Sequence, residues 1–223
     1  MVRVTFFYLI LFLFESIGDG YSQTYRIELP AGYNKILISD KLPGVDGSPY
    51  LWEGWKTGCV IFQNKKSIDS LLLRYNAYKE EMQFQMNNKI YIIGVPDSLS
   101  SININQRTFI YRGFTDKGIV KKSYFEVLSK GNAQIYVRHL IQIRESNYNA
   151  VLDAGEKNDQ MEQVETYFIK KGDSIVFIDK KGKNILQLLS DKSKDVIDFV
   201  KQNHFSYTDK KDLCRIAEYY NSL

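Results

Sequence analysis

The chain has very few of the residues that carry most protein chemistry. Its 223 residues include only two cysteines, Cys59 and Cys214, and two histidines, His139 and His204. Two cysteines exclude a disulfide-rich scaffold and a multi-cysteine zinc site. A glycine-rich phosphate loop, a G-x-S-x-G nucleophile elbow and an H-E-x-x-H zinc motif are also absent from the sequence. We therefore expect no catalytic, cofactor-binding or metal residues, no cofactor, and a protein that is not an enzyme.

The chain also lacks a concentrated charge of either sign. Its net charge is +4, and the paired lysines are spread along the sequence beside expected turns. A nucleic-acid-binding protein would gather its basic residues on one face. We expect no nucleic-acid partner. The lysine pairs are Lys65-Lys66, Lys121-Lys122, Lys170-Lys171, Lys180-Lys181 and Lys210-Lys211.

The first 22 residues have the pattern of a secretory signal peptide. Arg3 precedes an apolar run over residues 4–14, and the small residues Gly20 and Ser22 precede an expected cleavage before Gln23. The run is shorter than the roughly 20 apolar residues of a membrane-spanning helix, so an uncleaved anchor is the weaker alternative. The pattern predicts an exported protein, periplasmic or secreted, with no membrane span after removal of residues 1–22.

Residues 23–223 are expected to form a single domain, with a lead-in segment over 23–56 and strands over 57–178. Residues 82–86 alternate apolar and polar side chains, as do residues 135–143, and this period of two is typical of strands. The links between successive strands are too short for parallel crossovers, so the pairing should be antiparallel. We expect about eight to ten strands, a number that must curl or split to bury its faces.

The C-terminal part, residues 182–223, changes to helical spacing. Ser193 and Thr208 are expected to cap two of the helices. The apolar residues Leu213, Ile216, Ala217 and Tyr220 follow the i, i+3, i+4, i+7 pattern of a helix with one buried stripe. The predicted fold is mainly β (α+β): a curled antiparallel β-meander or half-barrel with two to three C-terminal helices packed on it.

Several residues could have a functional role, but a structural role explains them better. His139 lies on the apolar face of the longest expected strand and should be buried and structural, and His204 follows a helix as a C-terminal cap. Cys59 and Cys214 form a disulfide if the last helix docks suitably on the sheet, or else remain separate buried thiols. The acidic stretch 153–159 lacks the ligand spacing of an EF-hand, so residues 145–163 are expected to be a solvated, mobile loop.

Both tryptophans lie in the turn-rich segment 47–56. Aromatic side chains there plug the end of a curled sheet, or they clamp a sugar ring or a partner side chain. The plug is the favoured interpretation, because buried aromatic rings dominate core energetics.

As a whole, the chain resembles a group of uncharacterised exported envelope proteins of Gram-negative bacteria. The resemblance covers roughly residues 47–223 and implies an envelope location, but it brings no activity, cofactor or site residue. It depends on four loose motifs, which are GSPYL at 47–51, LRYN at 73–76, YFEVL at 124–128 and YYN at 219–221.

Three hypotheses on function remain open at this point. The first is a non-catalytic envelope protein that binds an apolar or amphiphilic, lipid-like ligand. The second is a protein–protein interaction module of the cell envelope, and the third is an enzyme with an unrecognised site. A continuous apolar cavity would favour the first, and a filled core with an exposed patch the second. An open cleft with His139 and carboxylates would favour the third.

Overall fold

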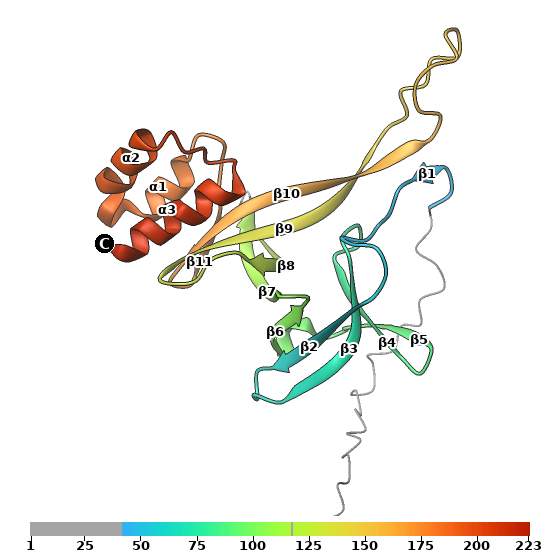
Figure 1. Ribbon diagram of the computed structural model, residues 1–223, viewed down its shortest axis with the longest axis horizontal. Coiled ribbons are helices and arrows are strands. Elements are labelled where there is room, and N and C mark those ends of the chain that lie inside the picture. Colours follow the sequence, from blue (N-terminus) through green and yellow to red (C-terminus); the bar gives the residue numbers. More distant parts are fainter. Residues whose placement is uncertain (1–41, 117) are drawn as a thin grey trace, which may run out of the picture. The chain divides into compact units, whose positions relative to one another are not determined.

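Strands dominate the computed structural model, which describes residues 42–116 and 118–223 (Figure 1). All of these residues belong to one compact unit. The predicted signal peptide, its cleavage point before Gln23 and most of the lead-in segment lie outside the described residues.

Eleven strands of the described residues form a single sheet that is not closed. Its order is β1-β10-β9-β8-β7-β6-β2-β3-β4-β5, and β11 pairs with a second part of β10. The strands are β1 (Val45–Asp46), β2 (Lys56–Phe62), β3 (Ser67–Asn76), β4 (Glu81–Met86), β5 (Lys89–Ile92), β6 (Leu99–Ile104), β7 (Arg107–Asp116), β8 (Ile119–Val127), β9 (Ala133–Arg144), β10 (Asp159–Lys171) and β11 (Ser174–Phe177).

The predicted antiparallel meander with C-terminal helices is confirmed. Every pairing from β2 to β11 is antiparallel. The exception is β1, which runs parallel to the start of β10 through the pairs Val45–Asp159 and Asp46–Gln160. Such a parallel pair needs a long connection between its strands, and most of the sheet lies between these two.

The sheet curls because β8 and β9 part soon after they meet. Their ladder contains only the pairs Glu126–Val137 and Val127–Tyr136. The turn between β3 and β4 occupies the gap on one side, where the backbone N–H of Ile141 donates to the carbonyl of Ala77 at 3.1 Å. Polar side chains complete this junction, since Glu80 in the turn accepts hydrogen bonds from Arg138 of β9 and Ser123 of β8.

Three short helices follow the last strand: α1 (Lys183–Leu188), α2 (Ser193–Gln202) and α3 (Lys210–Ser222). They pack against one end of β9, β10 and β11 (Figure 1). The predicted stripe of α3 is buried at all four positions. Among the described residues, none of the helices is both long enough and apolar enough to span a membrane.

The predicted helix caps differ in detail from the observed ones. Asp209, rather than Thr208, caps α3 and accepts hydrogen bonds from the backbone N–H groups of Lys211 and Asp212. Ser193 is the first residue of α2, which has no side-chain cap. A carboxylate suits the α3 position because it also meets the positive end of the helix dipole.

Candidate functional site

On the side of the sheet where β8 and β9 diverge, two hairpins face each other. One is the end of the β7–β8 hairpin, and the other is the β10–β11 hairpin. A cluster of aromatic rings fills the narrow part of the space between them. The rings of Phe114 and Phe125 each pack edge-on against Phe168, with centroids 5.1 and 5.0 Å apart.

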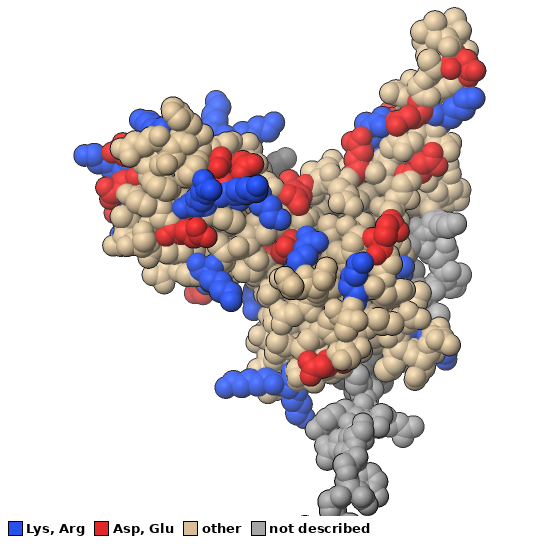
Figure 2. Space-filling view, in the orientation of Figure 1, with Lys and Arg blue, Asp and Glu red and all other residues tan. Residues whose placement is uncertain are grey.

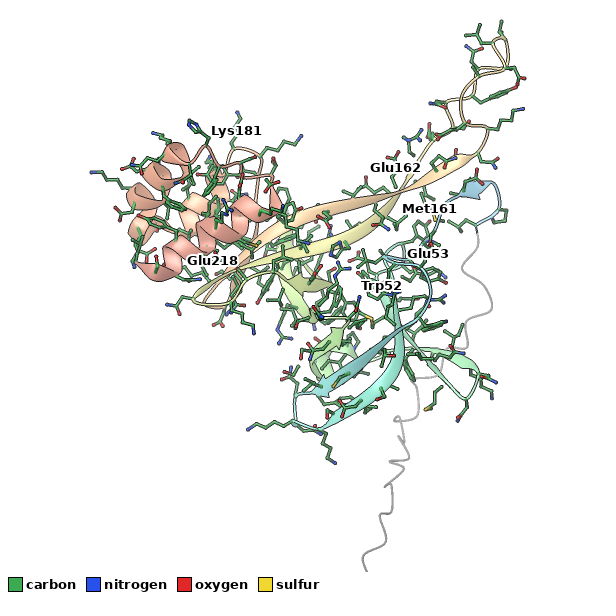
Figure 3. All side chains as sticks on the ribbon, viewed as in Figure 1. Trp52, Glu53, Met161, Glu162, Lys181 and Glu218 are labelled. Atoms are coloured by element: carbon green, nitrogen blue, oxygen red, sulfur yellow. The ribbon has the colours of Figure 1, made fainter. Side chains whose placement is uncertain are left out.

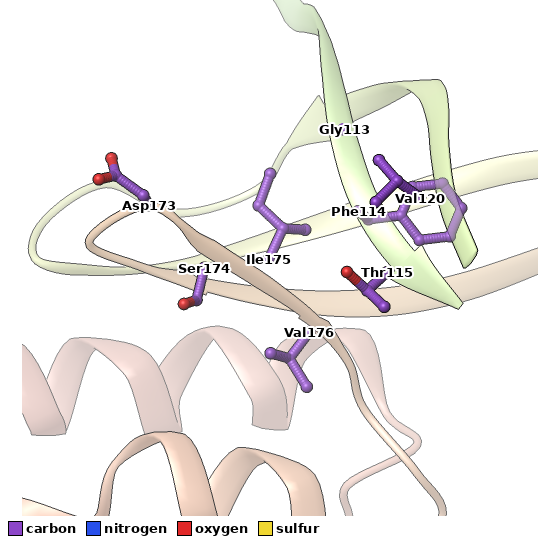
Figure 4. Close-up of a pocket in the computed structure, with 8 residues that line it drawn as sticks. All are labelled: Gly113, Phe114, Thr115, Val120, Asp173, Ser174, Ile175 and Val176. Atoms are coloured by element: carbon purple, nitrogen blue, oxygen red, sulfur yellow. The ribbon is translucent and has the colours of Figure 1, made fainter. Parts of the chain in front are cut away.

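The wide part of this space is an open pocket of about 550 Å³, which we call the wedge pocket (Figure 4). Its lining is residues 113–115 and Val120 from the first hairpin and residues 173–176 from the second. The volume lies within the range of about 300–1,000 Å³ that is usual for small-molecule sites.

The wedge pocket combines apolar side chains with polar ones from both hairpins, Thr115 from the first and Asp173 and Ser174 from the second. Phe114 is buried and backed by the aromatic cluster, whereas Val120 at the mouth is 75% exposed. Ser174, Ile175 and Val176 belong to β11, and Asp173 lies in the hairpin turn. A guest with an apolar body and a hydrogen-bonding head matches this distribution.

A second group of residues lies on the face of β9 that is opposite to Tyr136 and the aromatic cluster. It contains the predicted residue His139. Its Nε2 lies 2.7 Å from Oε2 of Glu126, and its Nδ1 lies 3.3 Å from Oε1 of Glu165. Arg107 binds Glu126 with both ends of its guanidinium fork, at 2.9 Å from Nε to Oε1 and 2.6 Å from Nη2 to Oε2. The arrangement follows from register, because Glu126 and Glu165 lie beside His139 on neighbouring strands.

The electrostatics of Glu126 suit a structural role. Burial raises the pKa of this carboxyl group, but hydrogen bonds from His139 and Arg107 outweigh burial and bring the pKa down to about 2. Glu126 is only 6% exposed and His139 only 3%. A carboxylate that is held ionised by two bonded partners is a poor general acid or base near neutral pH.

The predicted burial of His139 is thus confirmed. Its carboxylate partners could not be found from the sequence, because they are 13 residues before and 26 residues after it in the chain. Among the described residues, no group of three or more His, Cys, Asp or Glu side chains is arranged to hold a metal ion.

Trp52 covers the arginine of this buried cluster. Its ring centroid lies 6.0 Å from that of Phe109, and the guanidinium of Arg107 lies 5.6 Å from the Trp52 ring. The segment that contains Trp52 lies against β10, where the side chain of Gln163 donates to the carbonyl of Leu51 at 3.3 Å. Figure 3 labels Trp52 together with Met161 and Glu162 of β10. The Trp52 ring therefore packs on the sheet, whereas the Trp55 ring lies against the guanidinium of Arg74 at 4.3 Å, and the plug at the end of the sheet stays a prediction.

The remaining candidate residues lie apart from both constellations. Cys59 on β2 and Cys214 on α3 are free thiols in the structure. Cys214 packs with the helical core, whereas Cys59 lies next to Asp69, so the bridge considered from the sequence is not formed. His204 follows α2 with a positive φ of 56° and has no link to His139.

The acidic stretch 153–159 lies in an exposed loop that carries several hydrogen bonds. β10 begins at Asp159, so the loop after β9 is shorter than the predicted 145–163. Its carboxylates bind within the loop, since Asp153 accepts from the hydroxyl of Tyr148 and Glu156 pairs with Arg144. The loop is thus solvated and hydrogen-bonded, and its mobility stays a prediction.

No known protein family, curated protein or solved structure matches this chain. The membership of the group of exported envelope proteins, and the location that it implies, remain predictions.

Proposed function

We propose that the protein is a non-catalytic, exported binding protein that holds an apolar or amphiphilic small molecule in the wedge pocket. The observation that carries this proposal is an open pocket of about 550 Å³ with an aromatic floor, formed between two hairpins. The buried His139 cluster, by contrast, has carboxylates that are bonded to neighbouring side chains.

The ligand class follows from the lining. Phe114, Val120, Ile175 and Val176 offer an apolar surface that gains free energy when a hydrocarbon group displaces water. Asp173 is the one ionisable side chain among the lining residues, and it favours a cationic or hydrogen-bond-donating head.

The test uses N-phenyl-1-naphthylamine, a neutral fluorophore that brightens in apolar sites. The wild-type chain should bind it, and Val120→Asp should weaken binding at least about tenfold, since a charge at the mouth opposes an apolar guest. Ile119→Asp is the matched control: Ile119 is adjacent and 62% exposed but does not line the pocket. Equal losses in both variants, or no binding by the wild type, would refute the proposal.

Head-group preference is tested by competition with two detergents that share a dodecyl tail. Dodecyltrimethylammonium should displace the fluorophore better than dodecyl sulfate, and Asp173→Asn should remove the difference. A preference for dodecyl sulfate would contradict the role of Asp173 in selecting the head.

A further inference from the structure

Two glycines of the described residues lie inside strands, Gly58 in β2 and Gly113 in β7. Glycine weakens a strand, because it has no side chain to pack and loses more conformational freedom on folding than any other residue. A glycine in a strand therefore usually marks a bulge, a bend, or the close approach of another backbone or of a ligand.

Close packing explains Gly58 but not Gly113. A Cβ atom on Gly58 would overlap a backbone carbonyl oxygen of β6 and lie 2.7 Å from the side chain of Leu73. A Cβ atom on Gly113 would meet only the carbonyl oxygen of Lys121 at 3.8 Å and the side chain of Val120 at 3.9 Å, which are ordinary contacts. The register of β7 and β8 is continuous, so Gly113 forms no bulge. The remaining reasons are a bend of the strand and a guest that approaches the backbone, and Gly113 lines the wedge pocket.

The wedge pocket runs along the edges of two strands (Figure 4). Three successive residues of β7, 113–115, and three successive residues of β11, 174–176, line it. Successive side chains of a strand point to opposite faces, so a lining of this kind means that the pocket meets each strand at its edge. Among the described strands, β6 pairs with β7 only over residues 107–109, and β11 pairs only with β10. Neither edge has a strand beside it at the pocket.

The register directs backbone hydrogen-bonding groups to these two edges. In an antiparallel sheet, the N–H and C=O groups of alternate residues point to the same neighbouring strand. The N–H of Leu128 donates to β9 at 2.8 Å, so even-numbered residues of β8 turn towards β9. Gly113 lies opposite Lys122, an even-numbered residue, so its own N–H and C=O point away from β8. The N–H of Ile178 donates to β10 at 2.9 Å, so the N–H and C=O of Ile175 point away from β10.

Three lysines beside the pocket are neutralised and give it little attraction for an anion. The pairs are Lys121–Asp116, Lys122–Asp97 and Lys171–Asp191. Figure 2 shows basic and acidic side chains interspersed over the face in view. An uncharged guest that both donates and accepts hydrogen bonds therefore suits the pocket.

We propose that the guest of the wedge pocket is an uncharged amphiphile with a secondary amide, and that Gly113 is the residue that admits it. This inference rests on the proposed function and names the ligand class of the same pocket. A secondary amide has one N–H donor and one C=O acceptor, so it pairs with the edge of a strand as another strand does. The missing side chain of Gly113 lets the amide approach the backbone of β7, and the alkyl part of the guest lies against Val120 and Ile175.

The first test compares two guests that differ in one group. N-Octylacetamide and octyl acetate have the same length, but the ester has no N–H. Each competes with N-phenyl-1-naphthylamine for the full chain. The amide should displace the fluorophore at a concentration at least about fivefold lower, because a site that hydrogen-bonds an N–H rejects the analogue that lacks it. The ester is the more apolar guest, so selection by hydrophobic burial alone would favour it. Equal displacement, or a preference for the ester, would overturn the inference.

The second test makes the same substitution at both strand glycines. Gly113→Ala should weaken binding of N-octylacetamide at least about fivefold, because the added methyl group narrows the approach to the backbone. Its melting temperature should stay within about 3 °C of the wild type or rise, since alanine adopts the strand conformation and restricts the unfolded chain. Gly58→Ala should lower the melting temperature and leave binding by the folded protein unchanged. A Gly113→Ala chain that binds the amide like the wild type, or that melts far below it, would overturn the role given to Gly113.

The fluorophore separates this inference from the proposed function. No fluorophore binding by the wild type would reject the proposed function and this inference with it. Fluorophore binding that Val120→Asp weakens, together with no preference for the amide, would reject only the ligand class. Ile119→Asp is the control outside the lining and should keep the amide preference.

Discussion

The two faces of β9 hold different kinds of site. One face carries His139, which is buried and bonded to carboxylates on neighbouring strands. The other face carries Tyr136, which joins the aromatic cluster beneath the open wedge pocket. The comparison teaches that the most reactive residue types hold the sheet together here, whereas the pocket is lined by apolar, small and uncharged polar residues with a single carboxylate.

The physical reason is the cost of burying charge. A buried carboxylate is tolerated only when it is paired and hydrogen-bonded, so Glu126 needs both Arg107 and His139. The wedge pocket buries no ion pair and has no such requirement, so it can remain open.

The largest expected effect is a loss of unfolding free energy when the buried His139 cluster is disrupted. Glu126→Ala leaves Arg107 and His139 without their shared partner, and removal of one member of a buried pair typically costs about 3–5 kcal/mol. Urea unfolding measures this loss. Fluorophore binding by the folded fraction should be unchanged. If the variant is as stable as the wild type but loses binding, the division between a structural and a binding face is wrong.

A pH titration of stability sharpens the same comparison. The pKa of Glu126 is about 2 in the folded protein, below its ordinary value of 4.5. The folded state therefore binds this proton more weakly than the unfolded state. The stabilisation is complete above about pH 4.5 and is lost as the pH falls towards about 2.

The stabilisation involved is about 3 kcal/mol from the linkage relation. Because Asp179 and Asp191 also have lowered pKa values, the measurement is the difference in unfolding free energy between wild type and Glu126→Gln. That difference should be constant near neutral pH and should shrink below about pH 4. A difference that does not change down to pH 2 would show that the ionisation of Glu126 does not stabilise the fold.

The smallest expected effect on stability comes from a substitution in the open wedge pocket. Val120→Asp should change the unfolding free energy by no more than about 0.5 kcal/mol, because Val120 is exposed. The same substitution is expected to impair fluorophore binding strongly. Thermal unfolding followed by circular dichroism checks the first part, and a large loss of stability would mean that Val120 belongs to the core.

Local pattern predicted most of the secondary structure. The alternation in residues 82–86 and 135–143 marked β4 and β9, and the stripe ending at Tyr220 marked α3. The apolar residues of these elements recur with a strong period, so residues that are close in the sequence determine which face is buried. Boundaries were weaker where polar residues continue a strand, as in the first half of β10, because those side chains face solvent and break the apolar pattern.

The candidate site was much less accessible to prediction. Burial of His139 followed from its apolar neighbours, but its partner Glu126 is brought to it only by the contact of β8 with β9. The wedge pocket depends on the point at which these two strands part, and no local pattern encodes that point.

The sequence by itself determined the strands, the C-terminal helices and the burial of His139, because hydrophobic periodicity acts over a few residues. Only the tertiary structure decided the parallel pairing of β1 with β10, the placement of Trp52 over Arg107 and the pocket between the two hairpins. These features join residues that are far apart in the chain, and their geometry is set by sheet curvature and packing rather than by the preference of any one segment.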